Sequence, residues 1–200
     1  MIIGICGFQS SGKDTIANIL VNNYGFKQLS FASMIKDIVA IMFSWPRDKL
    51  EGLTKEDREW REEVDVNWSK IYNMPLLTPR YILQYFATEL FRNHFHKDIW
   101  VKIIENQLSQ HKNIVISDCR FQNEIDMLVK NRGKIIQVYR NLPEWFYKYK
   151  NGEDVEDVKK LHCSETEWIR SYYNYKIYNT GTIEELNEKI KLLFEKIEKI

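Results

Sequence analysis

The run of residues that most constrains this chain lies near its start and reads Gly7-Phe8-Gln9-Ser10-Ser11-Gly12-Lys13-Asp14-Thr15. An apolar run at 1–6 precedes it, as expected of a strand that is buried on both faces of a parallel sheet. Apolar residues at helical spacing follow it until Gly25, which is a typical helix stop. Gly7 and Gly12 allow the N–H groups between them to point at phosphate oxygens, and Lys13 can reach the β- and γ-phosphates. The order of strand, glycine loop, lysine and helix predicts a phosphate-binding loop for a nucleoside triphosphate.

One residue departs from the usual form of such a loop, in which Ser or Thr follows the lysine directly. Here Asp14 comes between Lys13 and Thr15. A glycine-rich turn that binds nothing is the alternative interpretation, but the strand before it and the helix after it are the context that a phosphate loop requires. The sequence therefore favours phosphate binding and marks Asp14 as unusual.

Composition predicts one compact domain, since 200 residues with 44% hydrophobic content can bury a core. The net charge is +1 without a basic block, so no nucleic-acid partner is expected. The chain has no apolar stretch of membrane-spanning length, and its start enters a strand directly, so neither a membrane partner nor a signal peptide is expected. Cys6, Cys119 and Cys163 lack metal-ligand spacing, which favours reduced thiols in a cytosol-like compartment.

Strand-like and helix-like segments alternate along the chain. Further strands are predicted at 27–31, 113–117, 134–139 and 175–178, and helices at 32–44, 78–95, 98–111 and 121–131. A final helix begins with a capping box, Thr182 with Glu185. Its apolar stripe consists of Ile183, Leu186, Ile190, Leu193, Ile197 and Ile200. Such alternation predicts an α/β fold in which helices wrap a parallel sheet.

Two stretches interrupt the alternation. Residues 46–77 are charged and contain tryptophan, and residues 142–174 form a long polar insertion. In a phosphoryl-transfer enzyme, such segments cover the substrates and exclude water. They are predicted as a substrate-covering insertion and a lid, while solvated surface helices remain the alternative.

Two further patterns bear on chemistry. Asp118 ends an apolar run, and the carboxyl ends of parallel strands meet beside a phosphate loop, so its carboxylate could steer Mg²⁺. On the helix that Thr78 and Pro79 begin, a mostly polar stripe can face one ligand, although an amphipathic surface helix explains it equally well. The stripe comprises Arg80, Gln84, Ala87, Thr88 and Phe91.

Several enzyme classes are excluded by missing motifs. The histidines show no zinc-ligand spacing, which excludes a metal hydrolase. No Gly-x-Ser-x-Gly elbow is present, which excludes an esterase of that type. A GTPase would need Asn-Lys-x-Asp and Asp-x-x-Gly, and the sequence contains neither.

These residues together resemble a family, the deoxynucleoside monophosphate kinase of T-even bacteriophages and related viral enzymes. The similarity spans nearly the whole chain, and seven pieces carry it in the family's order. They are Gly7 with Gly12-Lys13-Asp14-Thr15, 31–37, Arg80 with Gln84 and Ala87-Thr88-Glu89, 98–101, 118–124, 138–140 and 162–165. The chain departs from the family at Gln9 and Ser10, where basic residues are expected, and at Ala87, where glycine is expected. Animal phosphomevalonate kinases share some of this pattern and are the alternative.

The resemblance implies a single P-loop nucleotide kinase domain over 1–200, which transfers the γ-phosphoryl group of ATP to a deoxynucleoside 5′-monophosphate with Mg²⁺. Catalytic roles are implied for Lys13, Arg58 and Arg120. Contacts to ATP are expected from Gly7, Ser10, Ser11, Gly12, Lys13, Asp14, Thr15 and Arg140. Contacts to the acceptor nucleotide are expected from Lys36, Arg58, Arg80, Gln84, Thr88, Trp100, Arg120 and Glu124. Metal contacts are expected from Asp14, Thr15 and Asp118.

The resemblance also frames the expected partners and location. The partner is a small-molecule substrate, a homodimer is left open, and the expected location is the cytoplasm, which means the host cytoplasm if the chain is viral. An ATP-binding module without this acceptor stays open as well, because a phosphate loop alone indicates binding and not transfer.

Overall fold

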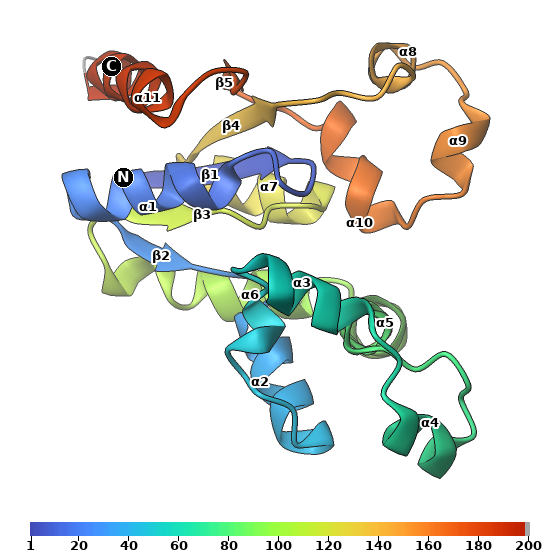
Figure 1. The fold of residues 1–200 in the computed structure, drawn as a ribbon. Helices are drawn as coiled ribbons and strands as arrows, with labels where there is room; N and C mark the ends of the chain where they lie inside the picture. Colours follow the sequence, from blue (N-terminus) through green and yellow to red (C-terminus); the bar gives the residue numbers. More distant parts are fainter. Residues whose placement is uncertain (199–200) are drawn as a thin grey trace. The chain divides into compact units, whose positions relative to one another are not determined.

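The computed structural model describes residues 1–198 and divides the chain into two compact units (Figure 1). The first unit consists of Met1–Phe31 and Ile103–Ile200, and the second of Ala32–Lys102. Over the described residues, none of the helices combines the length and the apolar character that crossing a membrane requires.

A sheet of parallel strands forms the centre of the first unit. Its strands are β1 (Ile2–Gly7), β2 (Lys27–Leu29), β3 (Ile114–Ile116), β4 (Lys134–Tyr139) and β5 (Tyr175–Tyr178). Their order across the sheet is β2-β3-β1-β4-β5, and every neighbouring pair is parallel. The predicted strand positions are confirmed, although β2 and β3 are shorter than their apolar runs. The fold is an α/β parallel sheet with flanking helices, as predicted.

Helices cover the sheet and connect its strands. The first unit contains α1 (Lys13–Tyr24), α7 (Gln122–Lys130), α8 (Phe146–Lys150), α9 (Glu156–Lys159), α10 (Cys163–Thr166) and α11 (Ile183–Glu198), with short 3₁₀ turns η3 (Leu108–Gln110) and η4 (Glu167–Arg170). Gly25 ends α1 in a left-handed conformation with φ 67°, as its position predicts.

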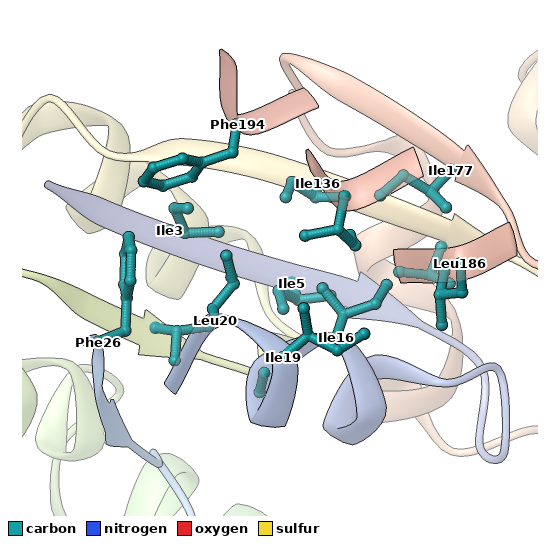
Figure 2. Close-up of a cluster of buried hydrophobic side chains, with 14 of the residues drawn as sticks. Ile3, Ile5, Ile16, Ile19, Leu20, Phe26, Ile136, Ile177, Leu186 and Phe194 are labelled. Carbon is teal, nitrogen blue, oxygen red and sulfur yellow. The ribbon is translucent and has the colours of Figure 1, made fainter. Parts of the chain in front are cut away.

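A hydrophobic core joins α1 and α11 to one face of the sheet (Figure 2). Ile16 and Leu20 of α1 and Leu186 and Phe194 of α11 pack with Ile5 and other residues of the strands. Each such side chain contributes roughly 1.5–3 kcal/mol when fully buried. The predicted stripe of the last helix is therefore scaffold, except that Ile183 is 49% exposed at the first residue of the helix. Ile200 lies outside the described residues.

The second unit is helical. It contains α2 (Ser33–Phe43), η1 (Lys49–Glu51), α3 (Lys55–Glu62), α4 (Val66–Tyr72), α5 (Pro79–Gln84) and a π-helix η2 (Tyr85–Phe95), and α6 (Ile99–Glu105) begins in it. Thr78 caps α5 through its side-chain oxygen, 3.1 Å from the backbone nitrogen of Tyr81. Phe43 stacks on Trp45 at 4.4 Å between ring centroids, and Trp68 packs edge-on against Phe43 at 5.2 Å.

Two predicted helices differ from the structure. The segment 78–95 is α-helical only to Gln84 and continues in wider π turns, which an apolar pattern near 3.6 residues per turn does not separate from α turns. The segment 98–111 is not one helix, because α6 ends at Glu105 and the N–H of Gln107 bonds the carbonyl of Ile104 in a tighter turn.

The two segments predicted to cover substrates contain helices of their own. Residues 46–77 include η1, α3 and α4 of the second unit. Residues 142–174 include α8, α9, α10 and η4 of the first unit, and Phe146 and Trp168 near their two ends are almost completely buried. The single-domain description and the covering roles stay predictions.

Candidate active site

The loop between β1 and α1 has the backbone that phosphate binding requires. Gly7 has φ 155°, and a Cβ there would lie 2.7 Å from the Ser11 hydroxyl oxygen and 2.7 Å from the carbonyl oxygen of Val138. Gly12 has φ 101°, and a Cβ there would collide with the side-chain amide of Asn179. Ser10 is left-handed with φ 60°. The N–H of Ser11 closes the turn on the carbonyl of Phe8 at 3.2 Å. Only glycine fits at the two ends of this loop.

The side chain of Ser11 provides the test of whether the loop fits a polyphosphate. Ser11 is 1% exposed, and its hydroxyl has no hydrogen-bond partner among the described residues. A buried hydroxyl without a partner is costly, and a phosphate oxygen inside the loop would accept its hydrogen bond. The loop therefore fits a triphosphate, with the start of α1 adding positive potential.

Lys13 is folded back onto the loop. Its Nζ donates to the carbonyl oxygen of Phe8 at 2.6 Å. Burial, followed by the nearby charge of Arg120, lowers the pKa of Lys13 from 10.5 to about 8, while Asp14, Glu165 and Cys6 raise it. The ammonium is thus held in a partly desolvated place where an anionic ligand would stabilise its charge.

The two candidate metal carboxylates accept hydrogen bonds from different donors. Asp14 Oδ1 accepts from the hydroxyl of Ser117 at 2.8 Å, and the Ser117 oxygen accepts from Gln28 Nε2 at 3.1 Å. Asp118 Oδ2 accepts from the Ser30 hydroxyl at 2.7 Å, and Oδ1 accepts from the N–H of Phe31 at 3.1 Å. Asp118 therefore fastens the end of β2 to the end of β3.

Across residues 1–198, no group of three or more His, Cys, Asp or Glu side chains could hold a metal ion by itself. A Mg²⁺ ion does not need such a group, because it is commonly held by one or two protein ligands together with phosphates and water. Thr15, in the first turn of α1, and Asp14 beside it fit that role.

The turn between β3 and α7 carries Arg120 and Glu124. Arg120 Nη1 donates to Glu165 Oε1 at 2.9 Å. Glu124 is 2% exposed, and its Oε2 accepts from the backbone N–H groups of Arg120 at 2.7 Å and Phe121 at 3.1 Å. This carboxylate caps the turn, a structural role that stands beside the predicted contact to a nucleotide base. Arg140 follows β4 directly and is exposed.

Besides Arg120 of the first unit, the cations predicted to contact the acceptor nucleotide lie in the second unit, where each has a partner. Lys36 Nζ pairs with Glu51 at 2.6 Å, and Arg80 Nε pairs with Glu62 at 3.2 Å. Arg58 Nη1 donates to the carbonyl oxygens of Gly52 at 3.2 Å and Leu53 at 2.9 Å. These cations are held by local contacts, and their predicted roles remain predictions.

The predicted base and sugar contacts of the second unit differ in exposure. Trp100 is 3% exposed, and its indole N–H donates to the carbonyl oxygen of Ala87 at 2.9 Å. Thr88 is also buried, whereas Gln84 is half-buried one helical turn after Arg80. The burial and the hydrogen bond of Trp100 indicate a packing role for it. The half-buried Gln84 is better placed than Trp100 or Thr88 to contact a ligand.

Sequence reasoning missed two supports of the loop. Asn179 is buried just after β5, and its Nδ2 donates to the carbonyl oxygen of Ser11 at 2.9 Å. Phe8 packs edge-on against Trp168 at 5.2 Å and Trp145 at 5.9 Å between ring centroids. The available signal was the position of Asn179 at the carboxyl end of a predicted strand, where parallel sheets place ligand contacts.

Known proteins share features with this chain. Residues 55–190 match the family model described as deoxynucleotide monophosphate kinase. A protein of Acanthamoeba polyphaga mimivirus, provisionally named deoxynucleotide monophosphate kinase, is 31% identical over 206 residues that cover 95% of this chain and 94% of that protein. Among solved structures, shikimate kinase from Aquifex aeolicus vf5 is 18% identical with a TM-score of 0.48, over 99% of this chain and 98% of that one. Dephospho-CoA kinase from Campylobacter jejuni is 18% identical with a TM-score of 0.47, over 98% and 96%.

Proposed function

The chain belongs to the deoxynucleotide monophosphate kinase family, and from this premise we propose that it transfers the γ-phosphoryl group of ATP to a deoxynucleoside 5′-monophosphate, giving the diphosphate. The observation that carries the proposal is the phosphate loop, in which Gly7 and Gly12 adopt backbone conformations that only glycine fits and the buried Ser11 hydroxyl lacks a partner among the described residues. A loop of this form without a polyphosphate would leave that hydroxyl's cost uncompensated.

The side chains around the loop suit phosphoryl transfer. Such transfer depends on positioning and on stabilising charge more than on covalent chemistry, so cations should converge on the phosphates. Arg120 is close enough to Lys13 for its charge to lower the pKa of that ammonium. Lys13 would hold the β- and γ-phosphates, and Arg120 would stabilise charge on the transferred group. When bound, Mg²⁺ would neutralise phosphate charge, with Thr15 and Asp14 as its protein contacts.

For the acceptor, the proposal assigns recognition to polar groups of the second unit. Lys36, Arg58 and Arg80 would hold the acceptor phosphate, since guanidinium and ammonium groups match its charge. The amide of Gln84 can both donate and accept hydrogen bonds, which suits a nucleobase edge.

The decisive experiment is a coupled assay of ADP formation by the purified full-length chain. ATP and Mg²⁺ are combined with each deoxynucleoside and ribonucleoside 5′-monophosphate in turn, with mevalonate 5-phosphate as the matched non-nucleotide acceptor. We expect ADP formation that depends on at least one deoxynucleoside monophosphate. If ADP forms only with mevalonate 5-phosphate, the acceptor is a phosphomevalonate and not a nucleotide. ATP binding without acceptor-dependent turnover would reduce the chain to a nucleotide-binding protein.

A further inference from the structure

Two glutamates hold the backbone of the turn that carries Arg120. Glu124 accepts from the N–H groups of Arg120 and Phe121, and Glu167 Oε1 accepts from the N–H of Gln122 at 2.8 Å. Charge-assisted hydrogen bonds to backbone N–H groups are about twice as strong as neutral ones. The Cα of Arg120 is therefore fixed before any ligand binds, and what remains is the direction of its side chain.

A third glutamate directs that side chain. Arg120 Nη1 donates to Glu165 Oε1 at 2.9 Å, with the two side chains 38% and 20% exposed. Among the described residues, Nε and Nη2 of Arg120 have no hydrogen-bond acceptor. Because a guanidinium presents five donors in a planar fork, Arg120 can hold Glu165 on one side and a phosphate oxygen on another.

Glu165 is itself built into the surroundings of the phosphate loop. The indole N–H of Trp168 donates to the backbone carbonyl of Glu165 at 2.9 Å, and the ring of Trp168 packs against Phe8 of the loop. Glu165 lies in the short helix α10, and at the start of that helix His162 Nδ1 accepts from the N–H of Ser164 at 3.2 Å. The carboxylate thus comes from the segment predicted as a lid, at a part of it that is anchored on the loop.

We propose that Glu165 is a positioning residue for phosphoryl transfer, which holds the Arg120 guanidinium beside Lys13 at the phosphate loop and compensates the repulsion between these two cations. The inference rests on the proposed kinase function. Two cations in a partly desolvated site repel, and without an anion Arg120 would turn toward solvent. The charged or titratable groups that face Lys13 are Arg120, Asp14, Glu165 and Cys6, and of these Glu165 also bonds Arg120.

The first experiment is a double-mutant cycle on kcat in the full-length chain. Glu165→Gln keeps an oxygen that can accept from Arg120 but removes the charge, and Glu156→Gln is the matched control, an exposed glutamate that pairs with Lys159. We expect Glu165→Gln to lower kcat about tenfold, with the KM for ATP changed less, and Glu156→Gln to behave as wild type. If Glu165 acts through Arg120, Arg120→Ala with Glu165→Gln loses no more than Arg120→Ala alone. Fully additive losses would overturn the inference.

The second experiment needs no acceptor and so separates this inference from the proposed function. The Kd of ATP with Mg²⁺ is measured at one pH in wild type, Glu165→Gln, Arg120→Ala, the double variant and Glu156→Gln. We expect Glu165→Gln to weaken ATP binding about threefold, Glu156→Gln to leave it unchanged, and the double variant to bind ATP no more weakly than Arg120→Ala alone. Wild-type affinity in Glu165→Gln, or fully additive losses in the double variant, would overturn the role of Glu165. A wild type that binds ATP but phosphorylates no monophosphate refutes the proposed acceptor, and the binding cycle then decides the role of Glu165.

Discussion

Burial and the nearby Arg120 guanidinium lower the pKa of Lys13 from 10.5 to about 8. Below pH 8 the folded protein holds this charge at a cost of about 3 kcal/mol relative to the unfolded chain. Between pH 8 and 10.5 the unfolded chain binds more protons, so the cost declines as pH rises. Above 10.5 both states are neutral and the cost is gone. A residue proposed to hold the phosphates therefore destabilises the protein that has no nucleotide bound.

We predict that Lys13→Met abolishes turnover, with at least a hundredfold loss of kcat, yet stabilises the protein at pH 7. Replacing the ammonium removes the charge penalty and also the bond to Phe8, which is worth about 1 kcal/mol, so a net gain of about 1–2 kcal/mol is expected. Denaturant unfolding at pH 7 and at pH 10.5 measures it, and the gain should vanish at the higher pH. Destabilisation at both pH values would contradict the stated cost.

Two substitutions separate the effect of the Asp14 charge from the effect of its hydrogen bond to Ser117. Asp14→Asn keeps a side-chain oxygen that can accept from Ser117, and Ser117→Ala removes the donor while keeping the carboxylate. If Asp14 contacts Mg²⁺, the Mg²⁺ concentration for half-maximal activity should rise several-fold in Asp14→Asn with the melting temperature unchanged. Ser117→Ala should leave that concentration near the wild-type value. The metal role fails if Asp14→Asn keeps the wild-type Mg²⁺ curve and melts at a lower temperature, as loss of a helix-end charge would predict.

At the scale of elements, apolar runs predicted the strands because a strand buried on both faces admits few polar residues. The same reasoning did not separate α from π turns after Gln84, nor foresee that Glu124 would be buried. Glu124 looks like an exposed helix residue in sequence. Its burial follows from the backbone N–H groups of Arg120 and Phe121, which need an acceptor and become visible only once the turn is folded.

Two predicted substrate contacts, Gln84 at the end of α5 and Trp100 in α6, are expected to respond differently to substitution. Trp100→Phe removes the bond to the Ala87 carbonyl and part of a buried ring, so we expect a lower melting temperature and unchanged KM for both substrates. The side chain of Gln84 is half-exposed. We therefore expect Gln84→Ala to raise the KM of the monophosphate roughly tenfold, with the KM of ATP and the melting temperature unchanged. Steady-state kinetics and thermal melts of both variants test this. If Trp100→Phe raises the KM of the monophosphate and leaves the KM of ATP and the melting temperature unchanged, the indole contacts the base as first predicted.

At the scale of the whole molecule, the phosphate loop was predictable because its chemistry lies in consecutive residues. Its supports were not, because they are far away in sequence. Phe8 meets Trp145 and Trp168, and the Ser11 carbonyl meets Asn179, which is 168 residues distant. The segment 142–174 consequently looked like a free covering piece in sequence, whereas its two ends contribute buried side chains to the first unit. Local pattern predicts local structure, and long-range packing decides the rest.

The bond between Asn179 and Ser11 also has a meaning for the order in which the protein is made. The side chain that holds the loop carbonyl is synthesised 168 residues after the loop itself. An unfinished chain would carry the complete glycine-lysine motif and still lack the hydrogen bond that holds the Ser11 carbonyl. In this protein, nucleotide capture should begin only after β5 has joined the sheet, so that incomplete chains do not sequester ATP. Asn179→Ala in the finished protein should reproduce part of that immaturity, as weaker ATP binding in a chain whose sheet is otherwise intact.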